Sequence, residues 1–536
     1  MIYILERGVN MVKGIFKYIF VIVVIILAIY TGFKLIKEDS MGEEGSLDQT
    51  SKVSTIQKDI RLSIAELDTI NPILSNNRNV HEISKIIYEP LITLNENYKL
   101  QYALAQEIVK QDDTTYIVKL RQGVLWQDGS NFTENDVHYT IDRIMDPNVS
   151  TVYRDNLRYL ATYERIDDYT FKLYLSQAVP FFEYNLTFPI LSAKYYGEDD
   201  FVNTDKNNSP IGTGMFKIDT VDGGNIRLVK NDIYWDNSKK PMAEEVIIKL
   251  YSSMGEVYNA FKSGELDIIT VTANNIEDYI GTLGYNKIEY KSRQYDFMAF
   301  NTQNEIFSDV AVRQAISKVI DKDSIVVSCL GSGYVSSNFS LDMGNWLYTR
   351  DLTTAVNLDE ARLILENAGW IYRNNSWIKN GKKLDINIAV NSNNEARVRV
   401  ADNIREQLEN FGIKVSVLQY SPERYSDMLN NKEYQCAIVG IECSFSPSLR
   451  TFFGEGNIAN YYNTEVLELI NKVENTTDEG VLYDSYKIIF DKYLEEVPYI
   501  GLYRNTDIVV YNQGLVGNIS PNAFNLYHNI YKWYRQ

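Results

Sequence analysis

The sequence predicts a two-lobed α/β protein that follows one N-terminal transmembrane helix. A length of 536 residues exceeds what one hydrophobic core usually organises, so two or more lobes are expected. The second half of the chain contains a strand–helix–strand pattern that is typical of a parallel sheet. Near the N-terminus, residues 18–33 form an apolar run without any charge.

The apolar run has the length of a membrane span. With flanking lysines that can reach the membrane surface, residues 15–36 are enough to cross about 30 Å of hydrocarbon as a helix. A bulky residue stands in Ala28-Ile29-Tyr30 where signal cleavage needs a small one, and no cysteine follows for lipid attachment. We therefore expect an uncleaved signal anchor in residues 1–37 and a polar linker in residues 38–55.

Charge places the main domain outside the cytoplasm. Arg7, Lys13 and Lys17 precede the span and favour a cytoplasmic N-terminus, whereas Lys34 and Lys37 after the span weaken this bias. Met11 is an alternative start to Met1. Residues 1–40 carry a net charge of about +2 and the whole chain −18, so the remainder is strongly acidic. Such a domain is a poor partner for nucleic acid. We expect a single-pass cell-membrane protein with an extracytoplasmic domain.

Cysteine usage predicts neither a disulfide framework nor a metal site. The chain has only three cysteines, Cys329, Cys436 and Cys443, which cannot form a full disulfide set, and no CxxC pair occurs. No cofactor is expected.

Periodic apolar residues define the second half of the chain. Residues 312–320 and 361–368 each repeat apolar positions at helical spacing. Residues 384–390 alternate like a strand, residues 401–411 are helical, and residues 413–417 alternate again. This βαβ order predicts a parallel sheet covered by helices.

The segment from Leu120 to Pro147 has local chemistry that explains its own shape. Residues 116–120 alternate like a strand, and residues 127–130 have the composition of a turn. Thr133 and Asp136 form an N-cap pair before a helix. We interpret this segment as structural.

The same segment resembles the signature of the periplasmic oligopeptide/dipeptide-binding family, the solute-binding proteins of peptide/nickel ABC importers. Matching residues are Leu120, Arg121, Gly123, Val124, Trp126, Asp128, Gly129, Thr133, Asp136, Val137, Tyr139, Thr140, Arg143, Ile144, Asp146 and Pro147. Shorter family-like segments include Asp68–Pro72 and Tyr88–Leu91. The resemblance extends over residues 56–536.

The resemblance implies a type II periplasmic-binding-protein fold of the large class, in which two lobes close over a ligand. The first lobe would comprise residues 56–92, 206–301 and 505–536. An inserted subdomain of that lobe would comprise residues 93–205, and the second lobe residues 302–504. Asn301 and Tyr503 would mark the hinge, at the two crossings of the chain between lobes.

In peptide-binding members, an Asp in a G-W-x-x-D-x-x-x-P loop pairs with the ligand's α-ammonium group. Alignment on Gly440 puts Ile441 at the Trp position and Ser444 at the Asp position, in a loop one residue shorter. Loss of one partner from a buried ion pair costs about 3–5 kcal/mol, so recognition of a free N-terminus needs another carboxylate. Glu442 could replace it, or could simply be exposed. Phe445 follows in the same loop.

Other candidate ligand contacts rest on the resemblance alone. Glu82 and Ile83 match a first-lobe stretch that touches the ligand in relatives, and Tyr461 belongs to a loop near the cleft. For each of them, packing within the scaffold is the favoured interpretation.

An enzyme is the weaker alternative. His81, His138 and His528 are widely separated, and no metalloprotease, nucleophile-elbow or phosphate-loop motif occurs. Only a glycosidase with two distant carboxylates would escape a motif search.

We expect a monomeric, non-enzymatic solute-binding protein that captures peptides and delivers them to ABC permease and ATPase subunits. The alternatives are a membrane-anchored peptide or nutrient sensor, and a receptor for a nickel complex, haem or an oligosaccharide.

Overall fold

The computed structural model describes residues 59–271 and 284–536, which belong to one compact unit. The predicted membrane anchor and linker lie outside the described residues. Within the part that is described, no helix is both long and apolar enough to cross a membrane.

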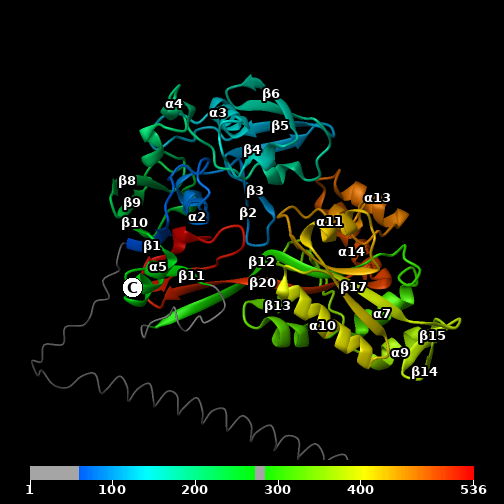
Figure 1. Ribbon diagram of the computed structural model, residues 1–536. Coiled ribbons are helices and arrows are strands. Elements are labelled where there is room, and N and C mark those ends of the chain that lie inside the picture. The colour runs from blue at the N-terminus through cyan, green and yellow to red at the C-terminus, as the bar shows by residue number, and fades with distance from the viewer. Residues whose placement is uncertain (1–58, 272–283) are drawn as a thin grey trace, which may run out of the picture. The chain divides into compact units, whose positions relative to one another are not determined.

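The first lobe is built on a four-stranded sheet with the order β1-β10-β9-β8, in which only β1 and β10 are parallel. Helix α2 packs on this sheet, and α5 and the short strand β11 follow β10 in the chain (Figure 1). The bounds are β1 (Asp59–Ala65), α2 (Arg78–Ile87), β8 (Phe216–Asp222), β9 (Asn225–Lys230), β10 (Glu245–Tyr251), α5 (Met254–Lys262) and β11 (Ile268–Val271).

Residues 93–205, called the insert below, carry a separate sheet, which is antiparallel and has the order β4-β5-β7-β6. The insert shares one hydrophobic core with the first lobe, since Ile60 and Phe171 belong to the same buried cluster. A hairpin, β2–β3, precedes the sheet. The bounds are β2 (Ile92–Leu94), β3 (Leu100–Tyr102), β4 (Ala105–Lys110), β5 (Thr115–Leu120), α3 (Glu134–Met145), β6 (Leu160–Asp167), β7 (Thr170–Leu175) and α4 (Ala193–Tyr196).

The second lobe confirms the predicted βαβ unit. Strands β17 and β18 are parallel and joined by α10, and β19 extends the same sheet. The predicted helices at 312–320 and 361–368 are α7 and α9. The bounds are α7 (Val310–Val319), α8 (Lys322–Ile325), β13 (Tyr334–Ser336), α9 (Leu358–Asn367), β17 (Asp385–Asn391), α10 (Glu395–Asn410), β18 (Lys414–Tyr420), α11 (Pro422–Asn430), β19 (Cys436–Glu442), α12 (Arg450–Phe453), α13 (Thr464–Val473) and α14 (Glu479–Glu496).

Short elements complete the described chain. They are the 3₁₀ turns η1 (Arg154–Leu157), η2 (Phe182–Asn185), η3 (Asp205–Asn208), η4 (Asn237–Lys239) and η6 (Ile530–Lys532), the π turn η5 (Val326–Leu330), and the strands β14 (Ile371–Arg373), β15 (Ser376–Lys379), β16 (Lys382–Lys383), β21 (Leu515–Val516) and β22 (Tyr534–Arg535).

Two long antiparallel strands, β12 (Tyr285–Phe300) and β20 (Tyr499–Asn512), connect the lobes side by side (Figure 1). Tyr290 packs against the first-lobe core, whereas Tyr295 is buried in a second-lobe core. The register between the strands shifts between Lys291 and Tyr295. The passage from one lobe to the other therefore coincides with an irregularity in the ladder, where a strand can bend.

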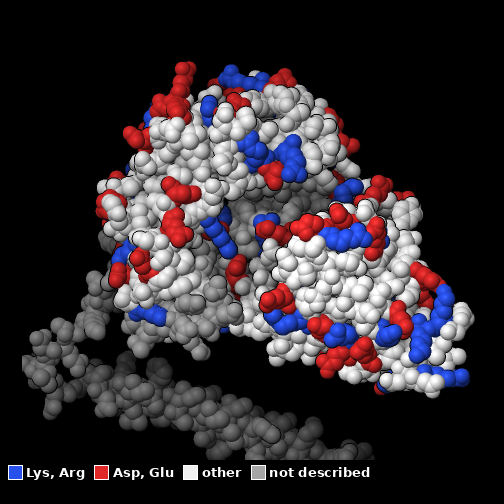
Figure 2. All heavy atoms as spheres, viewed as in Figure 1, with Lys and Arg blue, Asp and Glu red and all other residues white. Residues whose placement is uncertain are grey.

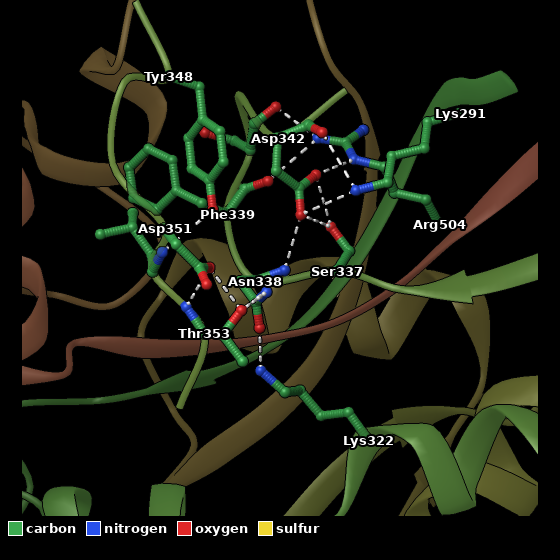
Figure 3. A network of polar contacts seen from close by, with 12 residues as sticks. Lys291, Lys322, Ser337, Asn338, Phe339, Asp342, Tyr348, Asp351, Thr353 and Arg504 are labelled. Atoms are coloured by element: carbon green, nitrogen blue, oxygen red, sulfur yellow. Dashed lines mark hydrogen bonds and ion pairs between the residues drawn. The ribbon is translucent and has the colours of Figure 1, made fainter. Parts of the chain in front are cut away.

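A buried ion pair lies at this passage (Figure 3). The Arg504 guanidinium, on β20, is fully buried and donates to the Asp342 carboxylate at 2.9 Å. Asp342 also accepts from the Ser337 hydroxyl at 3.0 Å and from the Asn338 backbone N–H at 2.8 Å. Arg504 donates further to the carbonyl of Ser292 on β12, at 3.3 Å. The pair thus joins both crossing strands to the segment 337–342.

The Leu120–Pro147 segment is structural, as predicted. Asp136 accepts from the Thr133 backbone N–H at 2.9 Å, which begins α3. Its carboxylate also accepts from the buried Trp126 indole at 3.1 Å and from the Ala193 N–H at 2.8 Å. Burial raises the pKa of Asp136, and these hydrogen bonds oppose that rise. Through Asp136, the segment joins helix α3 to the loops that contain Trp126 and Ala193.

Substitution of Asp342 should destabilise the whole unit. Asp342→Ala leaves the Arg504 charge buried without its partner, which costs about 3–5 kcal/mol. We expect a decrease of this size in the free energy of unfolding, measured by urea denaturation. Asp359→Ala is the control, since Asp359 pairs with Arg362 on an exposed helix and should lose about 0.5 kcal/mol or less. Equal losses for the two variants would contradict a structural role for the buried pair.

Candidate ligand-binding site

A cavity of about 710 Å³ lies between the lobes. Helix α2 and the middle of β20 supply its first-lobe wall, and the loop after β19 supplies its second-lobe wall. Figure 2 shows the described unit hollowed at its middle, with charged side chains of both signs around the rim. The lining residues are Arg78, His81, Glu82, Lys85, Val152, Tyr153, Thr187, Val271, Ser292, Arg293, Gln294, Ser332, Gly333, Tyr334, Glu442, Phe445, Asn505, Thr506, Asp507, Ala523 and Phe524.

Each charged side chain of this interlobe cleft is paired with one of opposite sign. Arg78 lies 3.2 Å from Asp507, and Lys85 lies 2.9 Å from Glu82. On the second-lobe wall, Arg293 lies 3.1 Å from Glu442. The cleft therefore presents both signs of charge without an uncompensated one.

The three carboxylates differ in how firmly they are held. Glu82 is 12% exposed, and it accepts from the Leu526 backbone N–H at 2.8 Å as well as pairing with Lys85. Asp507 is 31% exposed, and Glu442 is 56% exposed. An ion pair that is this exposed is worth about 0–1 kcal/mol, so Glu442 can change partner at little cost.

Phe445 reaches across the cleft from the second lobe. Its ring stacks on Tyr98 of the β2–β3 hairpin at 5.5 Å between centroids, and it meets Phe524 edge-on at 5.2 Å. The Arg293 guanidinium lies 4.5 Å from the centre of the same ring. Phe445 is therefore a contact between lobes as well as a wall of the cleft.

Gly440 leaves room for a buried ion pair beneath the cleft. It is opposite Asp296 in the β12–β19 ladder, and the Arg397 guanidinium lies 2.5 Å from the Asp296 carboxylate. A Cβ on Gly440 would lie 1.7 Å from Arg397 Nη2. Tyr503 donates to Asp296 at 3.2 Å, so this predicted hinge residue belongs to the same cluster. Burial raises the pKa of Asp296, and Arg397 opposes that rise.

The structure brings only part of the predicted site together. Glu82, Glu442 and Phe445 line the interlobe cleft. Ile441 packs against a second-lobe core. Ser444 is exposed, does not line the cleft, and accepts from the Ser446 backbone N–H at 3.1 Å.

Two further candidates are buried in the scaffold. Ile83 is 3% exposed and packs in the first-lobe core. Tyr461 packs in a second-lobe core and borders a separate hollow of about 420 Å³. Asn301 follows β12, and its amide donates to the carbonyls of Lys432 and Tyr434, each at 3.0 Å.

Charged residues of the cleft that were not predicted from the sequence include Arg78, Arg293 and Asp507. Arg78 and Asp507 are 429 positions apart, so only the fold brings them together. Arg293 is near Glu442 because β12 pairs with β19, where its neighbour Gln294 is opposite Glu442, and this pairing too results from the tertiary fold. In the described ranges, no group of three or more His, Cys, Asp or Glu side chains is arranged to hold a metal ion.

Comparison with known proteins identifies the relatives of this chain. The family model for bacterial extracellular solute-binding proteins, family 5 Middle, matches residues 99–457. The oligopeptide-binding protein AppA of Bacillus subtilis is 26% identical over 497 residues, which cover 88% of this chain and 90% of AppA.

Solved structures share the fold. AppA in complex with a nonapeptide has a TM-score of 0.52 at 24% identity, covering 90% of this chain and 100% of that one. The periplasmic murein tripeptide-binding protein MppA, in its unliganded open form, reaches 0.76 at 18% identity, with coverage of 89% and 97%. A nickel ABC transporter protein from Bacillus halodurans reaches 0.72 at 20% identity, with coverage of 86% and 97%. The predicted α/β periplasmic-binding-protein fold is confirmed.

Substitution of Gly440 should disrupt the pair beneath the cleft. In Gly440→Ala the new methyl group must displace the Arg397 guanidinium, which leaves Asp296 buried without its partner. We expect a loss of about 3 kcal/mol in the free energy of unfolding.

Two measurements separate this effect from a general intolerance of the added methyl group. Gly223→Ala is the matched control, since nothing lies within 4 Å of a Cβ at that turn. In an Arg397→Ala background the cost of Gly440→Ala should fall, because the clash with Arg397 is gone and only the Asp296 carboxylate oxygen, 2.7 Å from such a Cβ, must still shift. An undiminished cost in that background would show that another contact requires the glycine.

Proposed function

The chain belongs to the bacterial extracellular solute-binding proteins of family 5, which serve peptide/nickel ABC importers and are not enzymes, and we propose that its solute is a peptide. The peptide would bind in the interlobe cleft and be delivered to membrane permease and ATPase subunits. The name and ligand of AppA support this choice at the level of a relative.

The observation that carries the proposal is the exposed Arg293–Glu442 pair on the second-lobe wall. A peptide has a cationic and an anionic end, and its α-ammonium group needs a carboxylate in a partly desolvated site. Glu442 is the most exposed of the three cleft carboxylates and is held only by a pair of low cost. It can therefore exchange Arg293 for the ligand's ammonium group, in place of the Asp that Ser444 replaces.

Closure of the lobes would occur where β12 and β20 cross between them. The register shift after Lys291 supports bending at this level. Tyr503 is buried beside Asp296 on the second-lobe side. Asn301 is tied to the second lobe through Lys432 and Tyr434. In the proposed motion, both predicted hinge residues move with that lobe.

Residues 1–37 would anchor the protein, as a monomer, on the outer side of the cell membrane. Their uncharged apolar run supports this part of the proposal. The linker in residues 38–55 would keep the binding domain close to the permease.

A receptor for a non-peptide solute, or a sensor, is the second candidate function. It is favoured by the exposed Ser444, which supplies no carboxylate, and by Phe445, which already fills part of the cleft. Native mass spectrometry of the protein purified without refolding distinguishes the candidates. Bound peptides would support peptide capture, and one discrete non-peptide mass would support the alternative.

The role of Glu442 can be tested with peptides that differ only at the N-terminus. In Glu442→Gln the carboxylate is lost but its shape is retained, so free-amine peptides should bind roughly 10-fold more weakly or worse. N-acetylated peptides should bind with nearly the same affinity as to the wild type, as measured by isothermal titration calorimetry. The control is Glu107→Gln, which removes an exposed carboxylate that pairs with Lys119 on the insert. Equal losses for free and acetylated peptides would refute the assignment.

A further inference from the structure

A larger cavity, of about 1010 Å³, lies on the first-lobe side of the molecule. Its walls are α2, the β2–β3 hairpin, the loop 234–239 and the C-terminal segment 518–532. No second-lobe residue lines it. We call it the first-lobe compartment.

The first-lobe compartment and the interlobe cleft have a common wall. Five residues line both cavities: His81, Lys85, Tyr153, Thr187 and Phe524. Two side-chain contacts lie in this common wall, which we call the neck. His81 Nδ1 lies 3.1 Å from the Tyr153 hydroxyl, and the Lys85 ammonium lies 5.2 Å from the centre of the Phe524 ring. The two cavities are therefore adjacent.

The lining of the compartment suits varied side chains. Aromatic residues contribute apolar faces with polar tips, among them Tyr102, Tyr234, Trp235 and Tyr531. The half-buried Glu89 accepts from Trp235 at 2.8 Å, from Tyr234 at 3.0 Å and from Thr213 at 2.9 Å. These three donors satisfy the hydrogen-bond acceptors of its carboxylate.

We propose that the ligand is a long peptide whose first residues occupy the interlobe cleft and whose remaining residues pass the neck into the first-lobe compartment. This inference rests on the proposed function. Each chamber has the size that usually encloses one drug-sized ligand, of about 300–1,000 Å³. A tripeptide is a ligand of that size and fills one chamber, whereas a longer extended chain, at about 3.3–3.6 Å per residue, needs both.

The test compares peptides that share three N-terminal residues and grow from three to nine residues. For the wild-type full chain, affinity should increase at least 10-fold between the shortest and the longest. Thr93→Trp narrows the compartment from β2, a position that lines it but not the cleft. This variant should reduce the ratio of long-peptide to short-peptide affinity to about 2 or less. The matched control is Thr162→Trp, on an exposed strand of the insert that lines neither chamber.

A second measurement places the peptide directly. A nine-residue peptide with photoreactive benzoylphenylalanine at its last position should crosslink to the loop 234–239 or to the segment 518–532. A three-residue peptide labelled in the same way should crosslink to the cleft. This readout does not depend on any variant folding correctly.

The outcomes separate this inference from the proposed function. A length-independent affinity, a Thr93→Trp variant that behaves like its control, or crosslinks confined to the cleft would overturn the second chamber and leave peptide capture intact. Failure to bind a peptide of any length would overturn both.

Discussion

The buried ion pair of Arg504 and Asp342 fixes the point at which the chain passes between lobes. Taking a guanidinium and a carboxylate out of water costs several kcal/mol for each ion, and only close pairing with further hydrogen bonds offsets that cost. The Arg504 side chain is fully buried, and its donors also meet the carbonyls of Ser292, Phe339 and Ser340. The observed arrangement of β12, β20 and the segment 337–342 gives each of these polar groups a hydrogen-bond partner. The same arrangement positions the strands that line the cleft.

The ion pairs of this protein differ in burial. The more buried pairs stabilise the fold, whereas the exposed pair is available to a ligand. The pair Arg504–Asp342 is buried, and Asp296 is buried beside an Arg397 that is 18% exposed, so loss of either partner is costly. The pair Arg293–Glu442 is exposed on the cleft wall and is separated cheaply. A ligand can therefore exchange partners with the exposed pair while the buried pairs hold the strands in place. The same short stretch of β19 serves both purposes, through Gly440 and Glu442.

The fold was predictable where local pattern and tertiary packing agree. Helical spacing located α7 and α9, and alternation located β17 and β18, because each pattern reports the face that the element buries. The site was less predictable. Ile83 matches a ligand-contacting stretch, but with Val80 and Ile87 it lies on one face of α2, and that face packs into the core. Spacing alone could have excluded it. No spacing relates Arg78 to Asp507, because their proximity results from the tertiary fold.

The short loop after β19 explains both the missing carboxylate and the contact between lobes. Ser444 turns outward, and the next residue, Phe445, enters the space between Tyr98 and Phe524. An aromatic pair is worth about 0.5–1.5 kcal/mol and an exposed cation–π contact about 0.5–1 kcal/mol. The three contacts of Phe445 are therefore comparable with those that one aromatic ligand side chain could make. Phe445 holds the lobes together here, and an aromatic side chain of a peptide can make the same kinds of contact. Exchanging the contacts of Phe445 for contacts with such a peptide therefore changes the free energy little.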